Sequence, residues 1–184
     1  MSTYETRSSL GPLNIGIPLD ARVAVTTLLN EVLADENILL VKTRKAHWDA
    51  SGPQFHALHR LWGEQHDLIT RRVDQLAERV RMLGRFPIAT MRGWLDHSTL
   101  HEEQGTVASA TEVVIALSHD HEALARRLRE AVAASGHRWS DAGTADLLTT
   151  ILRDHEQMVW MHRAYVMGES LAVIRPSNVL PMEA

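Results

Sequence analysis

The sequence of 184 residues contains no cysteine, which excludes disulfide bonds, thiolate metal sites and cysteine nucleophiles. Any metal chemistry must therefore use His, Asp and Glu, and the chain has 11 His and 23 Asp plus Glu. No stretch approaches the run of about 18 apolar residues that a membrane span needs. Residues 1–19 also lack the basic start and apolar centre of a signal peptide. We expect a cytoplasmic protein without a membrane partner.

Basic residues do not dominate the chain, because 19 Lys plus Arg stand against 23 Asp plus Glu, for a formal net charge of -4. Proteins that hold nucleic acid on a broad surface are usually strongly basic. The two ends are balanced as well, with Glu5 near Arg7 and Arg175 near Glu183. Binding to DNA is therefore doubtful, although compaction of DNA stays open as an alternative function.

Apolar residues recur at helical spacing in four long segments, and Gly and Pro gather mainly between them. These segments are 20–47, 54–83, 109–136 and 144–168. The second connection, residues 84–108, is long and carries a possible short helix over 90–97. Four amphipathic helices with one long middle crossover predict an all-α four-helix bundle over residues 20–169. Residues 1–19 and 170–184 are expected to be tails.

Several residues mark the expected ends of these helices. Asp20 is a plausible N-cap for the first helix, and Gly84 a C-cap for the second. Ser109 begins the sequence Ser-Ala-Thr-Glu, which ends at Glu112 and has the form of a capping box. These signals place the start of the third helix close to residue 109.

One stretch carries a dense set of motifs in a fixed order. They are His47-Trp48, Gly52-Pro53-x-Phe55, Leu58-His59 and Asp74-x-x-Ala-Glu78-Arg79. This order is similar to the ferroxidase signature of the Dps family of mini-ferritins, and the resemblance covers roughly residues 20–168. It implies a ferritin-like bundle that assembles from two-fold dimers into a hollow dodecamer. The implied activity is oxidation of Fe(II) by hydrogen peroxide or dioxygen, with storage of Fe(III) mineral and protection from oxidative damage.

The residues themselves can support metal binding. Asp74 and Glu78 lie four positions apart, so a helix presents both carboxylates on one face. Carboxylate oxygens, together with the imidazoles of His47 and His59, form a set of ligands that suits iron, with zinc as a possible competitor. A solvated charged face remains the alternative for an isolated Asp and Glu pair. The resemblance adds Trp48 as a residue near the iron, with a packed core position as its alternative.

Helix geometry limits where these four ligands can meet. His59 and Asp74 are 15 positions apart on one expected helix, which is roughly 22 Å of rise. They cannot share an ion within one chain. If they form one centre, two copies of this helix must lie antiparallel across a two-fold axis, so that each dimer holds two equivalent sites.

Two absences bear on this interpretation. The sequence has no Glu-x-x-His motif, which conventional ferritins use to build a di-iron site inside one bundle. The Dps pattern usually has an acidic ligand four residues after the second histidine, where this chain has Gly63. Glu64 and His66 are candidate replacements. The incomplete set keeps open a metal-binding cage with little ferroxidase activity.

Two further acids lie where the fourth long helix is expected to begin. The resemblance implies that this region lines negatively charged three-fold pores, which gives Asp141 and Asp146 a possible role in cation entry. Acids near a helix N-terminus are also common as capping and dipole partners. Both interpretations stay open at this point.

Overall fold

The computed structural model describes residues 13–102, 105 and 109–173. Its elements, in order, are α1 Leu19–Asp49, α2 Phe55–Met82, α3 Met91–His97, α4 Ala110–Ala133, a π-helix Ala134–Arg138 and α5 Ala142–Val173. The predicted all-α bundle of four long helices with a short helix in the crossover is confirmed.

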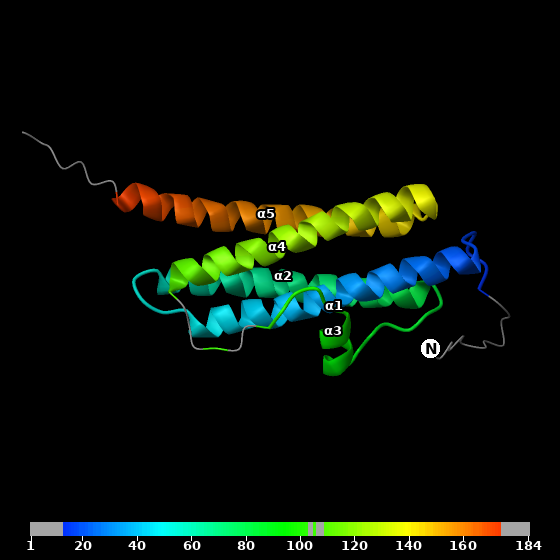
Figure 1. Cartoon of the computed structure of the whole chain (residues 1–184), viewed down its shortest axis with the longest axis horizontal. Helices are drawn as coiled ribbons and strands as arrows, with labels where there is room; N and C mark the ends of the chain where they lie inside the picture. Colours follow the sequence, from blue (N-terminus) through cyan, green and yellow to red (C-terminus); the bar gives the residue numbers. More distant parts are fainter. Residues whose placement is uncertain (1–12, 103–104, 106–108, 174–184) are drawn as a thin grey trace, which may run out of the picture.

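The four long helices form two hairpins that pack on each other. Helices α1 and α2 form one pair, and α4 and α5 form the other (Figure 1). The connection between α2 and α4 carries α3, which packs against the outer side of α1 (Figure 1). This arrangement places one face of each long helix towards a common centre.

The core is built from apolar side chains of all four long helices. Its largest fully buried members include Leu29 and Leu33 of α1, Ile69 of α2, Leu128 of α4 and Ile151 of α5. Burial of one such side chain contributes about 2 kcal/mol relative to leaving it in water. Helix α1 also buries several polar residues, among them the three consecutive residues Asp35, Glu36 and Asn37.

Two predicted helix ends are confirmed and one is wrong. Gly84 has φ +81 after α2, with hydrogen bonds from Gly84 N to Arg81 O and from Arg85 N to Val80 O, as in a Schellman motif. The capping box of Ser109 and Glu112 is present at α4. Asp20 is not a cap, because α1 already begins at Leu19 and Asp20 lies in its first turn.

The crossover is fixed by one buried carboxylate. Asp35 of α1 is 1% exposed and accepts hydrogen bonds from Ser98 Oγ at 2.8 Å and from Thr99 N at 2.6 Å. Arg127 of α4 pairs with the same carboxylate at 2.8 Å. A buried carboxylate that lost these partners would be costly, so the network locks the segment after α3 onto both hairpins.

Most of each predicted tail lies outside the described residues. Glu5 and Arg7 in the first tail, and Arg175 and Glu183 in the second, fall outside the described residues. Helix α5 continues past the expected end near residue 168 to Val173. Among residues 13–102, 105 and 109–173, no helix has both the length and the apolar character that crossing a membrane requires.

Candidate metal centre

Two of the predicted ligands lie side by side at one end of the α1–α2 hairpin. His47 is in the last turn of α1 and His59 is in the second turn of α2, on either side of the turn at 50–54. Their imidazole rings stack with centroids 3.8 Å apart and planes 22° apart. Both side chains are half-buried in the single subunit, so each still has an exposed edge.

The hydrogen bonds of this pair determine which nitrogen carries the proton. His47 Nδ1 lies 2.7 Å from the carbonyl oxygen of His59, and His59 Nδ1 lies 2.9 Å from the carbonyl oxygen of His47. A carbonyl oxygen can only accept, so both Nδ1 atoms must donate. Each neutral ring then keeps a lone pair on Nε2, which is the form of histidine that binds a metal ion.

Gly63 gives the His47 ring the space that it occupies. A Cβ atom at position 63 would lie 3.2 Å from His47 Cε1 and 3.3 Å from His47 Nδ1, closer than most real contacts. At position 63, where an acidic ligand is missing, the imidazole of His47 therefore packs against the glycine backbone. Of the two candidate replacements, His66 Nε2 accepts a hydrogen bond from Arg44 Nε at 2.8 Å, and Glu64 is exposed.

The predicted carboxylate ligands do not reach the histidines of their own subunit. Helix α2 is continuous from Phe55 to Met82, and Asp74 and Glu78 are exposed near its far end. Within the described ranges, no three His, Asp or Glu side chains gather closely enough to hold a cation. The single subunit thus presents the imidazoles and the carboxylates as two separate half-sites.

Trp48 lies next to the histidine pair and faces solvent. Its side chain is 71% exposed, with the Arg44 guanidinium 5.9 Å from the ring centroid. The alternative of a packed core tryptophan does not hold within the subunit. Large exposed aromatic side chains are typical of surfaces that another protein covers.

The two candidate pore acids differ in their surroundings. Asp141 is 2% exposed and caps α5, because its Oδ1 accepts from Thr144 N at 3.0 Å and pairs with Arg79 Nη2 at 2.7 Å. Its carboxylate is thus engaged inside the subunit. Asp146 is exposed on the first turns of α5. The pore assignment of both acids stays a prediction, and Asp146 suits it better.

The structure also shows a polar cluster that sequence reasoning missed. Glu36 of α1, His121 of α4 and His155 and His162 of α5 are each at most 1% exposed at the centre of the bundle. Burial lowers the pKa of His162 to about 4. Burial, with the neighbouring His155 and His162, also holds the pKa of His121 well below its ordinary value. His121 and His162 are therefore neutral at pH 7.

A signal for this cluster was present in the sequence. His121 stands in register with Leu117, Leu124 and Leu128, and so it occupies a core position of its helix. A histidine in such a position must be buried, and a buried polar group needs a partner. The partners come from other helices, which only the folded chain identifies.

Comparison with known proteins gives a consistent result over most of the chain. Residues 26–169 match the model of the ferritin-like domain of the Ferritin family. An uncharacterized low temperature-induced protein of Nostoc sp. is 47% identical, over 92% of this chain and 93% of that protein. The DNA protection during starvation protein of Brevibacillus brevis is 34% identical, over 77% of this chain and 94% of that protein.

A solved structure agrees with these relatives. The Dps protein of Vibrio cholerae superposes with a TM-score of 0.79 at 25% identity, over 86% of this chain and 99% of that chain. That protein is described as a member of a broad superfamily of ferritin-like diiron-carboxylate proteins.

Proposed function

The chain belongs to the Dps family of mini-ferritins, and on that premise we propose that it oxidises Fe(II) at centres shared between two subunits and stores the ferric product. The observation that carries the proposal is the His47 and His59 pair. Both rings are held by their Nδ1 atoms on backbone carbonyls, which leaves two Nε2 lone pairs at the subunit surface. Backbone acceptors of this kind orient the ligands before the metal arrives.

The proposed centre combines the two half-sites of a two-fold dimer. His47 and His59 of one subunit bind Fe(II) together with Asp74 and Glu78 of its partner subunit. Anionic oxygen ligands favour Fe(III) over Fe(II), so the carboxylates promote loss of an electron. With peroxide as oxidant, two Fe(II) ions supply two electrons, the O–O bond breaks, and two protons complete two water molecules.

The proposed assembly follows from the same interface. Two-fold dimers hold two equivalent centres each, and six dimers complete the hollow dodecamer that the family resemblance implies. Exposed Trp48 lies beside the histidines, where the partner subunit would cover it. Asp146 is a candidate for the cation entry pores, because exposed carboxylates around a narrow opening concentrate cations.

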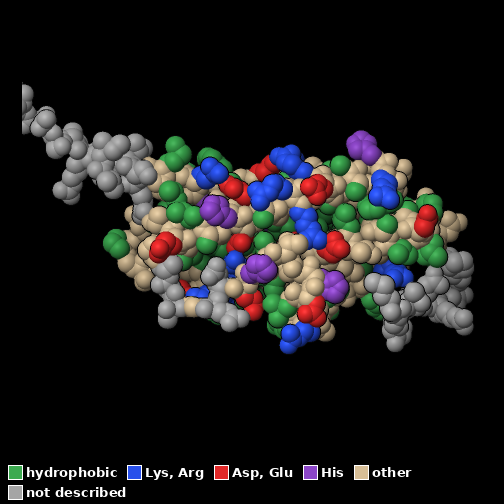
Figure 2. Space-filling view, in the orientation of Figure 1, with side chains coloured by type: hydrophobic (Ala, Val, Ile, Leu, Met, Phe, Trp, Pro, Cys, Tyr) green, Lys and Arg blue, Asp and Glu red, His purple; other side chains and the backbone are tan. Residues whose placement is uncertain are grey.

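A cage that binds metal with little ferroxidase activity is the second candidate. Gly63 supports it, because the His47 ring fills the space where an acidic ligand would otherwise stand. The remaining ligands are two imidazoles and two carboxylates, and a site with these ligands also suits zinc. DNA compaction has less support, since acidic and basic side chains are interspersed on the face shown in Figure 2.

Mixed cages test both the activity and the sharing of the site. One variant carries His47→Ala and His59→Ala, and the other carries Asp74→Asn and Glu78→Gln. Each variant alone should oxidise Fe(II) at the background rate in stopped-flow absorbance with peroxide. After co-assembly from equal amounts, half of the dimers are mixed and each keeps one intact centre, so about a quarter of the wild-type activity should return.

The control is a mixture of the two variants that were assembled separately and never exchanged subunits. It should stay at background, because each cage then contains only one kind of defect. If co-assembled cages also stay at background while their mass matches the wild type, the centre is not shared. If both variants alone keep the wild-type rate, the ferroxidase proposal fails.

A further inference from the structure

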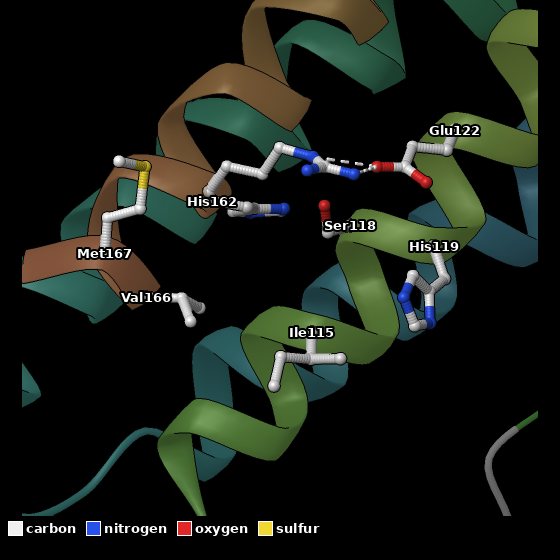
Figure 3. A pocket seen from close by; sticks show the side chains of 8 residues that line it. Ile115, Ser118, His119, Glu122, His162, Val166 and Met167 are labelled. Carbon is white, nitrogen blue, oxygen red and sulfur yellow. Dashed lines mark hydrogen bonds and ion pairs between the residues drawn. The ribbon is translucent and has the colours of Figure 1, made fainter. Parts of the chain in front are cut away.

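A pocket between α4 and α5 leads from the surface towards the centre of the bundle. Its volume is about 280 Å³, and its lining includes Ile115, Ser118, His119, Glu122, His162 and Met167. Figure 3 shows the His162 ring pointing from α5 towards Ser118 on α4. Glu122 pairs with Arg163 at 2.6 Å beside it. The pocket therefore has charged groups on its wall and a fully buried imidazole at its inner end.

His162 presents an unused nitrogen at this inner end. Its Nε2 lies 3.1 Å from Gln65 Oε1, an acceptor, so Nε2 carries the proton. The other nitrogen, Nδ1, has a lone pair, is fully buried and has no hydrogen-bond partner. An unpaired polar atom in this position is costly unless something binds it.

His121 presents a second unused nitrogen, fixed by a chain of two hydrogen bonds. His155 Nε2 lies 2.8 Å from Glu36 Oε1, and the carboxylate accepts, so the proton is on Nε2. His155 Nδ1 is then an acceptor for His121 Nδ1 at 2.8 Å. His121 Nε2 is left with a lone pair, and it too is buried without a partner.

The two rings stand at a separation that suits a shared ion. The centroids of His121 and His162 are 5.4 Å apart. Two imidazoles bound to one tetrahedral ion, with metal to nitrogen distances of about 2.1 Å, would have centroids about 5.2 Å apart. The lowered pKa values of both rings keep them neutral, which a metal ligand requires.

We propose that His121 Nε2 and His162 Nδ1 bind a divalent transition metal ion inside each subunit, beside the pocket between α4 and α5 that His162 lines. Glu36, acting through His155, and Gln65 are positioning residues that hold the two rings in the required tautomers. This site is separate from the proposed interface centre and uses none of its residues.

The class of ion follows from the ligands. Imidazole nitrogens suit zinc, ferrous iron and cobalt, and disfavour magnesium and calcium, which prefer oxygen. Two protein ligands leave further coordination positions for water in the pocket. Glu36 belongs to the same buried cluster, with its Oε1 2.8 Å from His155 Nε2.

Co(II) is a suitable probe, because its visible absorption reports tetrahedral nitrogen ligation. The titration uses assembled cages of the His47→Ala, His59→Ala variant, so that the interface histidines do not contribute. We expect about one tightly bound Co(II) per subunit, with zinc displacing it. Adding His162→Gln or His121→Phe should weaken binding at least 10-fold. His155→Phe, which removes only a positioning residue, should weaken it about 10- to 100-fold.

His119→Ala is the matched control, because His119 is an exposed histidine on the wall of the same pocket. Binding should survive this change, and loss of binding there would place the ion at the rim and overturn the proposal. A zinc-soaked crystal gives a measurement that does not depend on variant folding. An anomalous peak should lie between the His121 and His162 rings. If that peak is missing, or if His162→Gln and His121→Phe bind Co(II) as before, the proposal is wrong.

Discussion

The molecule contains two groups of histidines that are held in opposite ways. The surface pair, His47 and His59, is oriented by backbone carbonyls at the end of a hairpin. The interior histidines are oriented by side chains, through Glu36 and Gln65. In His47, His59, His121 and His162, one ring nitrogen donates to an acceptor and the other keeps a free lone pair, whereas His155 uses both of its nitrogens. The position of each group in the fold then decides which further side chains can bind the same metal ion.

The same contrast has an energetic side. Backbone carbonyls are present whatever the side chains are, so the surface pair needs no buried charge to hold it. The interior histidines depend on Glu36, a carboxylate that is fully buried and has one oxygen without a partner. Buried charged groups are costly unless they are well paired. We therefore expect changes inside the bundle to affect stability, and changes at the surface pair to affect activity.

The largest expected effect on stability is at Glu36. Glu36→Ala leaves the His155 N–H without its acceptor and opens a cavity, so it should lower the free energy of unfolding by about 3 kcal/mol. Glu36→Gln keeps an acceptor oxygen and should cost less. Glu130→Ala, which removes an exposed glutamate of α4, should change stability by less than about 0.5 kcal/mol. Melting temperatures at one fixed protein concentration measure all three, and equal losses for Glu36→Ala and Glu130→Ala would remove the contrast.

The next effect is a dependence of stability on pH that comes from the interior. Burial lowers the pKa of His162 from 6.5 to about 4 in the folded chain. The unfolded chain therefore binds a proton at His162 below about pH 6.5, whereas the folded chain does so only near 4. The contribution of this residue is complete above pH 6.5 and is lost between pH 6.5 and 4, by roughly 3 kcal/mol.

His162→Phe isolates this contribution from that of the other ionisable groups. Its melting temperature should fall less steeply than that of the wild type as the pH is lowered from 7 to 4.5. His119→Ala, which changes an exposed histidine of the same pocket, should follow the wild-type curve. Parallel curves for His162→Phe and the wild type would show that the interior histidine does not titrate in this range.

The bundle and the surface pair could be predicted from the sequence because their signals are local. Apolar spacing marks the helices, and Ser109 with Glu112 marks a helix start within four residues. His47 and His59 are separated by a single turn, so their approach follows once both helices are placed. The mistake at Asp20 is also local, since the preceding Pro18 starts the helix without a side-chain cap.

The interior cluster could not be predicted because its partners are far apart in the sequence. Glu36 and His155 are separated by 119 positions, and His121 and His155 by 34. Helical spacing places each of them on a core face, but the rotation of the helices about their axes decides which side chains meet. The same applies to Asp141, whose ion pair with Arg79 spans 62 positions and explains its burial.

The smallest expected effect is a modest loss of Fe(II) oxidation on substitution of Gly63. It tests whether the surface pair needs the space that glycine leaves for the His47 ring. Gly63→Ala adds a methyl group that would lie 3.2 Å from His47 Cε1, so the ring must shift by a few tenths of an ångström. Alanine also favours the helix by about 1 kcal/mol, which should keep the melting temperature close to that of the wild type. The rate of Fe(II) oxidation should fall about 3- to 10-fold, because a ligand moves from its binding position.

Gly136→Ala is the control, because Gly136 lies in the π-helix, away from the histidine pair. Its added methyl group would lie 3.7 Å from Ala145 Cβ, which is an ordinary contact. Its oxidation rate should match that of the wild type. Gly63→Asp distinguishes the effect of crowding from the effect of a missing ligand. Aspartate crowds His47 as alanine does, and it also adds a carboxylate. If Gly63→Asp oxidises Fe(II) faster than Gly63→Ala, the added oxygen ligand compensates for the displaced ring. If both are equally slow, the room that glycine leaves for His47 matters more than the ligand it lacks.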